Sequence, residues 1–443
     1  MMFSRRELMN IVIPLIINQT LAVALGMEDS LMVSSAGEAA ISGVGLVDSI
    51  NQLLVYLFTA LASGGSVVIS QMLGTSQIKR ANNAAKQLVW VVLLAAVIMT
   101  ALALSFRGPL LRLIFGNIEA DVMANASAYF LYTALAYPFL GLFSACQSVF
   151  HAIGNAKVSM LVSLVMNIVN ISANAVFIFA CHMGVTGAAL GTLLARIVGS
   201  LLLLYLLHNK KNTLYLEDFL HYKPHFPTIR NICSIGIPNG LENSMFQLGR
   251  VMTQSLIATF GTAQIAANAA ALSVTSLQYI PGTAIGVAII TMVGRCIGAR
   301  EEAQAKKYTI RLVVITYAFI LAISAVIGLL IGPIVGSYHL TGESGELAKH
   351  LILYHCLCVC TVWPIAFTLP NSFRAASDVK FTMVLSIFSM WVFRIGGSYF
   401  LSSFFHLGIW SVWYAMALDW IFRAIVFGIH YLRGSWLKKY HAF

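Results

Sequence analysis

Five acidic side chains fall inside long apolar stretches of the sequence and are the first candidates for chemistry: Glu28, Asp29, Asp48, Glu242 and Asp419. A carboxylate is costly in an apolar environment, so acidic residues there usually bind a cation, carry a proton or pair with a base. Asp419 and Arg423 are four residues apart, a spacing at which we expect an ion pair on one helix. Asp48 falls near the start of its stretch, where we expect water to solvate it.

Asp29 is the strongest of these candidates because the sequence offers it no evident basic partner. Asn170 and Asn174 are four residues apart and must share a helix face, and Thr192 follows in the next apolar stretch. One carboxylate with amide and hydroxyl oxygens suits a proton or a hard cation such as Na⁺. The alternative for the amides and the hydroxyl is interhelical hydrogen bonding that only holds the helices together.

Glu242 follows a proline, Pro238, by four residues, and a proline inside a helix leaves a nearby backbone carbonyl without its donor. We therefore predict that Glu242 lines a polar cavity or takes part in ion coupling. Arg250 is a poor partner for it, because eight residues along a helix separate the two by about 12 Å. Arg394 is the better candidate partner and the second predicted residue of this site.

The elements that must position these residues are apolar helices, since 59% of the 443 residues are hydrophobic and only 10% are charged. Only a lipid bilayer can solvate so much apolar surface. The seven cysteines lie in or beside apolar runs and do not indicate a disulfide framework. Near His355, thiols two residues apart point to different helix faces, so no metal site is predicted there.

Twelve stretches are long enough to cross about 30 Å of hydrocarbon. We therefore expect an all-α polytopic membrane protein. The predicted spans are 8–33, 45–72, 87–106, 124–150, 158–181, 187–208, 232–260, 266–297, 308–336, 346–372, 381–403 and 408–433.

The second half of the sequence repeats the first at an offset of 224 residues. Pro14, Gly37, Gly74 and Gly184 align with Pro238, Gly261, Gly298 and Gly408. One residue off that register, Phe150-His151-Ala152 aligns with Phe373-Arg374-Ala375. Recurrence of Gly and Pro in one register predicts two six-helix lobes related by a pseudo-twofold axis along the membrane normal. Two such lobes predict transport by alternating access.

The buried charges do not follow this repeat. Asp29, Asn170, Asn174 and Thr192 align with Thr253, Arg394, Ser398 and Met416. This difference between the lobes points to the first lobe for ion coupling.

Lys and Arg are unevenly divided between the two sides of the predicted membrane. Twenty of the 27, Arg374 among them, fall on the side of the termini and three on the other. This predicts a multi-pass protein of the cell membrane with both termini in the cytoplasm, and it accounts for the net charge without nucleic-acid binding. The predicted parts are an N-lobe (1–208), a cytoplasmic interfacial linker (209–231), a C-lobe (232–433) and a cytoplasmic tail (434–443), in a protein expected to be a monomer.

Taken together, these motifs resemble the multidrug and toxic compound extrusion (MATE) family over essentially the whole chain. The resemblance rests on Asp29-Ser30-Leu31-Met32-Val33, on Asn170 with the segment from Gly184 to Thr192, and on Gly236-Ile237-Pro238 with Glu242, Phe373–Asp378 and Arg394. It implies export of amphipathic, often cationic, small molecules against H⁺ or Na⁺, with a cation site at Asp29, Asn170 and Thr192. Asn174 departs from the aspartate that many members have there, which leaves one protonatable group and weakens the case for tight Na⁺ binding.

The alternative function is a flippase for lipid-linked saccharides, from the wider superfamily. Such a protein handles anionic pyrophosphate groups and should place several basic residues in its cavity, whereas only four arginines fall well inside the predicted spans. The sequence has no Walker loop, nucleophile elbow or zinc-binding helix motif, so neither an enzyme nor a cofactor is expected.

Overall fold

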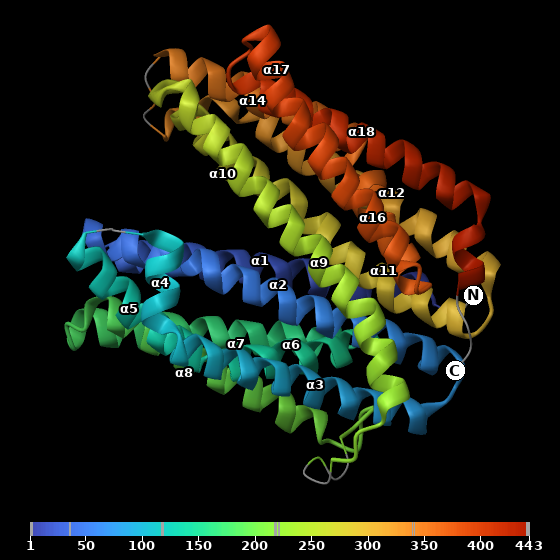
Figure 1. Ribbon diagram of the computed structural model, residues 1–443. Coiled ribbons are helices and arrows are strands. Elements are labelled where there is room, and N and C mark those ends of the chain that lie inside the picture. Colours follow the sequence, from blue (N-terminus) through green and yellow to red (C-terminus); the bar gives the residue numbers. More distant parts are fainter. Residues whose placement is uncertain are drawn as a thin grey trace. The chain divides into compact units, whose positions relative to one another are not determined.

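A computed structural model describes residues 3–34, 37–116, 119–216, 219, 222–338, 340 and 342–439, without the side chains of residues 27–31, 34, 38 and 439. It is helical nearly throughout this part of the chain (Figure 1). The chain divides into two compact units, Phe3–Gly240 and Leu241–Phe443. The boundary between the two units lies within the helix α9 (Phe226–Ile257), on the C-terminal side of the predicted linker 209–231.

The first unit consists mainly of long helices that pack side by side (Figure 1). Its elements are α1 (Arg5–Ser34), α2 (Glu38–Gly74), α3 (Ile78–Ser105), α4 (Arg107–Phe115), α5 (Ala120–Leu135), α6 (Tyr137–Ala152), α7 (Ala156–Asn174), the π-helix η1 (Ala175–Ala180), α8 (Gly184–Leu207) and the start of α9 (Phe226–Ile257).

The second unit has the same kind of helices with more interruptions. After α9 come η2 (Ala258–Phe260), α10 (Thr262–Ser276), η3 (Leu277–Tyr279), α11 (Ile280–Gly298), α12 (Glu302–Leu329), α13 (Ile331–Gly336), α14 (Gly342–Thr361), the π-helix η4 (Pro364–Thr368), α15 (Pro370–Ala375), α16 (Val379–Ser389), the π-helix η5 (Met390–Gly396), α17 (Gly397–Phe405), α18 (Ile409–Arg433) and η6 (Ser435–Lys439).

The backbone repeats at the same offset of 224 residues as the sequence. The bounds of α3 and α12 differ by this offset, and so do those of α2 and the run Thr262–Gly298. Residues with positive φ recur as well: Gly37 with Gly261, Ser76 with Arg300, His182 with His406 and Gly184 with Gly408. The backbone turns are thus duplicated. At Ser76 and Arg300 the positive φ recurs although the side chains differ and neither residue is glycine.

Nine helices in the described ranges are long and apolar enough to cross a membrane, or eleven if each of two bent pairs is one span. These eleven coincide with eleven of the twelve predicted spans. The remaining prediction, 232–260, coincides with α9, which contains Arg230, Glu242 and Arg250 and is not among these helices. Twelve spans therefore remain a prediction.

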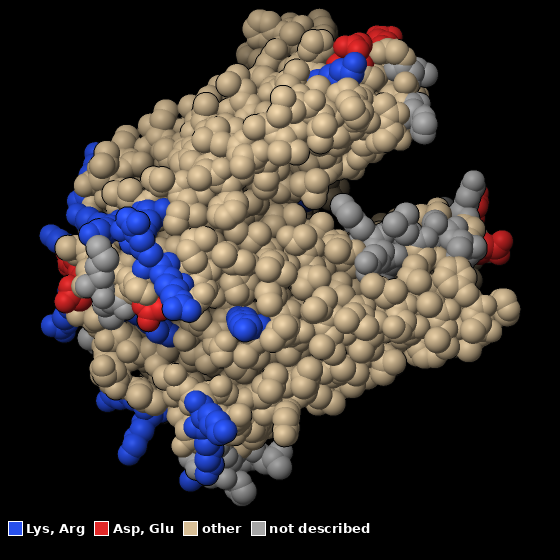
Figure 2. All heavy atoms as spheres, turned by 180° about the vertical axis from the view of Figure 1, so that it is seen from behind, with Lys and Arg blue, Asp and Glu red and all other residues tan. Residues whose placement is uncertain are grey.

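Charge is concentrated at helix ends. On the face drawn in Figure 2, Lys and Arg gather at one end of the helices, and a broad surface with few charged residues covers the rest. Such a distribution is typical of helices embedded in lipid, where only the ends reach water.

The described part of the predicted linker (209–216, 219 and 222–231) forms a strap that packs on α3. Trp90 stacks on Phe219 and Tyr222 with ring centroids 5.1 Å apart in each case, and its Nε1 donates a hydrogen bond to the Phe219 carbonyl over 3.0 Å. Gln87 Nε2 donates to the Lys223 carbonyl over 2.7 Å. The aromatic residues of the linker thus fasten it to the first unit.

Candidate functional site

A stripe of buried polar side chains runs along α7 in the first unit. Ser163, Asn167, Asn170 and Asn174 recur every three or four residues and therefore share one face of the helix. Asn174 Nδ2 donates a hydrogen bond to Asn170 Oδ1 over 3.1 Å, and Asn170 Nδ2 donates to Thr192 Oγ1 on α8 over 3.4 Å. The structure therefore brings three of the predicted N-lobe residues together in one hydrogen-bonded chain.

Close approach of α8 to α7 depends on Gly191. A Cβ atom at that position would lie 2.0 Å from Asn174 Oδ1, well inside van der Waals contact. Directly after Asn174 the helix widens into the π-helix η1. Widened turns of this kind are rare in α-helices and are often found at functional sites.

Asp29 lies on α1, which packs against α7. The two helices are joined by a hydrogen bond from Ser163 Oγ to Asn18 Oδ1 over 2.5 Å. The side chains of Asp29 and Glu28 lie outside the described part of the structure. The carboxylate of the predicted N-lobe site therefore remains a prediction.

Asp48 is half-buried and hydrogen-bonded, in contrast to the solvated residue that we expected. Its Oδ1 accepts hydrogen bonds from Tyr129 OH over 3.2 Å and from Asn51 Nδ2 over 3.3 Å. Tyr137 OH donates to Asn51 Oδ1 over 2.8 Å. The expectation failed because α2 begins at Glu38, several residues before the predicted span, and so carries Asp48 into the bundle.

Glu242 forms an ion pair with Arg374, which corrects the prediction that Arg394 is its partner. Arg374 Nη2 lies 2.8 and 2.9 Å from the two carboxylate oxygens of Glu242, and Nη1 donates to Asn371 Oδ1 over 3.0 Å. The two paired side chains are 16% and 10% exposed. Arg374 is thus not one of the free basic residues that we assigned to a membrane surface.

Asp419 and Arg423 form the predicted ion pair on α18, and both side chains are buried. Arg423 Nε donates to Asp419 Oδ1 over 2.8 Å, and Ser389 Oγ donates to the same oxygen. Arg423 Nη2 also donates to the Ser386 carbonyl over 2.9 Å. The carboxylate and its arginine are therefore tied to α16 as well as to each other.

Arg394, on η5, lies beside the Asp419–Arg423 pair but is not hydrogen-bonded to it. Its Nη1 is 3.9 Å from Asp419 Oδ2, beyond hydrogen-bond distance. Its guanidinium carbon lies 5.4 Å from the centroid of the Phe246 ring, within the range of a cation–π contact. The second predicted residue of the C-lobe site thus lies next to Asp419, apart from Glu242.

The second unit also holds a polar network that sequence reasoning missed. His355 is fully buried, with Nδ1 2.6 Å from Gln278 Oε1 and Nε2 2.6 Å from Tyr279 OH. Gln278 Nε2 donates to Ser324 Oγ over 2.7 Å, so its Oε1 is left to accept from His355 Nδ1. A signal existed, because Gln278 and His355 are polar residues inside the predicted spans 266–297 and 346–372.

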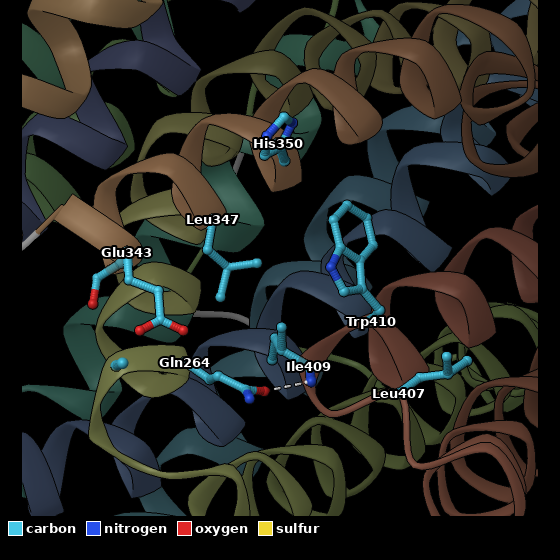
Figure 3. Close-up of a pocket in the computed structure, with 9 residues that line it drawn as sticks. Gln264, Glu343, Leu347, His350, Leu407, Ile409 and Trp410 are labelled. Carbon is cyan, nitrogen blue, oxygen red and sulfur yellow. Dashed lines mark hydrogen bonds between the residues drawn. The ribbon is translucent and has the colours of Figure 1, made fainter.

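A pocket of about 340 Å³ lies at another place in the second unit, where α10 and α14 begin (Figure 3). Glu343, His350 and Trp410 line it, and Gln264 Oε1 accepts a hydrogen bond from the Ile409 backbone N–H over 2.7 Å. The pocket contains none of the predicted site residues.

Comparison with known proteins places the whole chain in one family. The model of the MatE family matches residues 14–176 and again residues 238–400, two segments that begin 224 residues apart. The chain belongs to the MatE family. Members of this family are transporters and not enzymes, and they use ion coupling without a cofactor.

Named relatives of this MatE protein are full-length matches. A "Probable multidrug resistance protein NorM" of Thermotoga maritima is 25% identical over 98% of this chain and 94% of its own length. An "Uncharacterized transporter YisQ" of Bacillus subtilis is 25% identical over 96% of this chain and 94% of its own length.

Solved structures share the fold. An outward-facing multidrug resistance MATE transporter has a TM-score of 0.91 at 21% identity, with 98% of this chain and 96% of that chain covered. A transporter of the wider superfamily from Pyrococcus furiosus, described as having a binding pocket of reverse polarity, has a TM-score of 0.89 at 21% identity with the same coverage. At this identity the likeness establishes the fold alone.

Proposed function

We propose that this MatE protein is a secondary active antiporter that exports amphipathic small molecules, cationic drugs or metabolites among them, in exchange for H⁺ or Na⁺. The observation that carries the proposal is the buried hydrogen-bonded chain of Asn174, Asn170 and Thr192 beside α1, the helix of Asp29. A polar cluster of this kind next to a carboxylate offers oxygen ligands to a small cation.

Asp29 is the residue on which coupling depends in this proposal. With one carboxylate and neutral amide and hydroxyl neighbours, the site takes a proton or binds Na⁺ weakly. Binding changes the charge on α1, a helix that contains Pro14. Coupling requires that the ion bind one conformation of the protein more tightly than the other.

The second unit supplies the cavity in this proposal. Glu242 is neutralised by Arg374 and so contributes polarity without net charge, whereas Arg394 contributes a positive charge. The duplicated helix bounds and the family match in two segments support two six-helix lobes and alternating access. The uneven distribution of Lys and Arg supports a cell-membrane protein with cytoplasmic termini.

Transport by the purified protein in proteoliposomes tests the proposal. A panel of cationic dyes is followed while Na⁺ and pH gradients are imposed separately. We expect uphill movement of at least one dye under one of the two gradients. Dye movement that ignores both gradients would refute antiport.

A further inference from the structure

Two arginines share one buried carboxylate in the second unit. Asp419 is bonded to Arg423 and Ser389 through Oδ1, and its Oδ2 lies 3.9 Å from Arg394 Nη1. Asp419 can neutralise one of the two guanidinium groups. The cluster therefore carries an excess positive charge, which is located on Arg394.

The guanidinium of Arg394 donates no hydrogen bond to any residue that the structure describes, although its side chain is only 14% exposed. A guanidinium has five N–H donors in a planar fork. Burying such a group without acceptors costs stability, so proteins rarely keep one that has only a structural role. The donors of Arg394 are thus available to a ligand.

The surroundings of Arg394 are aromatic and positive. Phe246 lies under Arg394, and Phe367 lies 5.2 Å from the guanidinium carbon of Arg423. Arg250, an exposed residue on α9, is close enough to Arg394 to repel it electrostatically. A flat apolar group could pack against the rings while an anion meets the guanidinium.

The backbone at this place is also unusual. Arg394 lies on the π-helix η5 and Phe367 on the π-helix η4. Gly249 on α9 permits close approach to η5, since a Cβ there would lie 2.2 Å from the Met390 methyl group. π-Helical turns are an irregularity that proteins often keep at functional sites.

We propose that Arg394 is a specificity-determining residue that binds the carboxylate of an amphipathic substrate. The inference rests on the proposed export function and assigns a binding role to one residue of the second unit. A carboxylate matches the fork of the guanidinium with two parallel hydrogen bonds. The carboxylate of the substrate also supplies a second negative charge, because Asp419 can neutralise only one of the two guanidinium groups.

A matched pair of dyes tests this assignment. Rhodamine B carries a free carboxylate, and its ethyl ester is a cation of nearly the same shape. Binding of each is measured by fluorescence polarisation with the full-length protein in detergent, and export of each is measured in proteoliposomes. We expect Arg394→Gln to weaken binding of the acid by about 10-fold or more, as loss of a charged hydrogen bond implies, and to change binding of the ester less than about twofold.

Two further variants separate ligand binding from folding. Arg394→Lys keeps the charge and loses the fork, so its loss should be intermediate. Arg230→Gln, which changes an exposed arginine near the start of α9, is the control and should affect neither dye. Arg394 has no hydrogen bonds to lose, only a cation–π contact and a 3.9 Å approach to Asp419, so Arg394→Gln should lower the melting temperature by no more than about 2–4 °C.

The outcomes are distinct. Equal loss of both dyes, or a melting temperature of Arg394→Gln that falls by more than this small amount, would assign Arg394 to structure or to a lipid phosphate and overturn the proposal. Export of the ester without binding of the acid would refute the anion site and leave cation export standing. A protein that exports neither dye would contradict the proposed function, and the inference would fail with it.

Discussion

Removing Arg423 tests the buried charge cluster most quantitatively. Arg423→Met leaves Asp419 without its closest partner in a place where the carboxylate is fully buried. Breaking a buried pair in this way costs about 3–5 kcal/mol. Arg394 lies 3.9 Å from the other carboxylate oxygen and can offset part of the loss, so we expect a value near 3 kcal/mol.

The free energy of unfolding is measured by reversible titration in mixed detergent micelles. Arg433→Met is the control, because Arg433 is an exposed residue at the end of the same helix and should change stability by no more than about 0.5 kcal/mol. The double variant with Asp419→Asn should recover no more than part of the loss, because it removes the carboxylate that lost its closest partner but leaves the Arg394 guanidinium without a counter-charge. A loss below about 1 kcal/mol for Arg423→Met would refute the reasoning.

Two other predictions concern the first unit. Gly191→Ala should lower the free energy of unfolding by about 1–3 kcal/mol and abolish ion-coupled transport, because its Cβ would lie 2.0 Å from Asn174 Oδ1. Gly45→Ala is the control: a Cβ there meets nothing within 4 Å, so stability and transport should stay intact. Equal effects of the two variants would contradict the packing argument. Trp90→Ala should lower the free energy that holds the linker strap against α3 by about 2–4 kcal/mol, because it removes the stacking and the hydrogen bond of Trp90. Limited proteolysis within 209–231 should then be roughly 30-fold faster or more. An unchanged cleavage rate would show that Trp90 does not hold the strap.

The helices and their repeat could be predicted because both depend on local sequence. Apolar length sets the helices, and residues such as Gly37 and Gly184 mark turns that need positive φ. Bends within helices could not be predicted in this way. The break between α5 and α6 (45°) and that between α14 and α15 (59°) fall inside single predicted spans, because a bent helix keeps its apolar pattern.

The site could be predicted where its residues share one helix. Asn170 with Asn174 and Asp419 with Arg423 are four residues apart, and helix geometry alone brings them together. Arg374 could not be assigned to Glu242, because their approach depends on the bend before α15 and on packing between distant segments. Arg394 was recognised as buried, but its lack of hydrogen bonds is a property of the packed unit.

Transport by Asp29→Asn, a nearly isosteric change that removes the protonatable group, tests the central claim most directly. Proteoliposomes with the unmodified protein and with the variant are compared under the imposed gradient that drives dye export. We predict that the variant is inserted and folded, with an unchanged melting temperature, and that gradient-driven export is lost. Gradient-driven export at the unmodified rate would contradict coupling through Asp29.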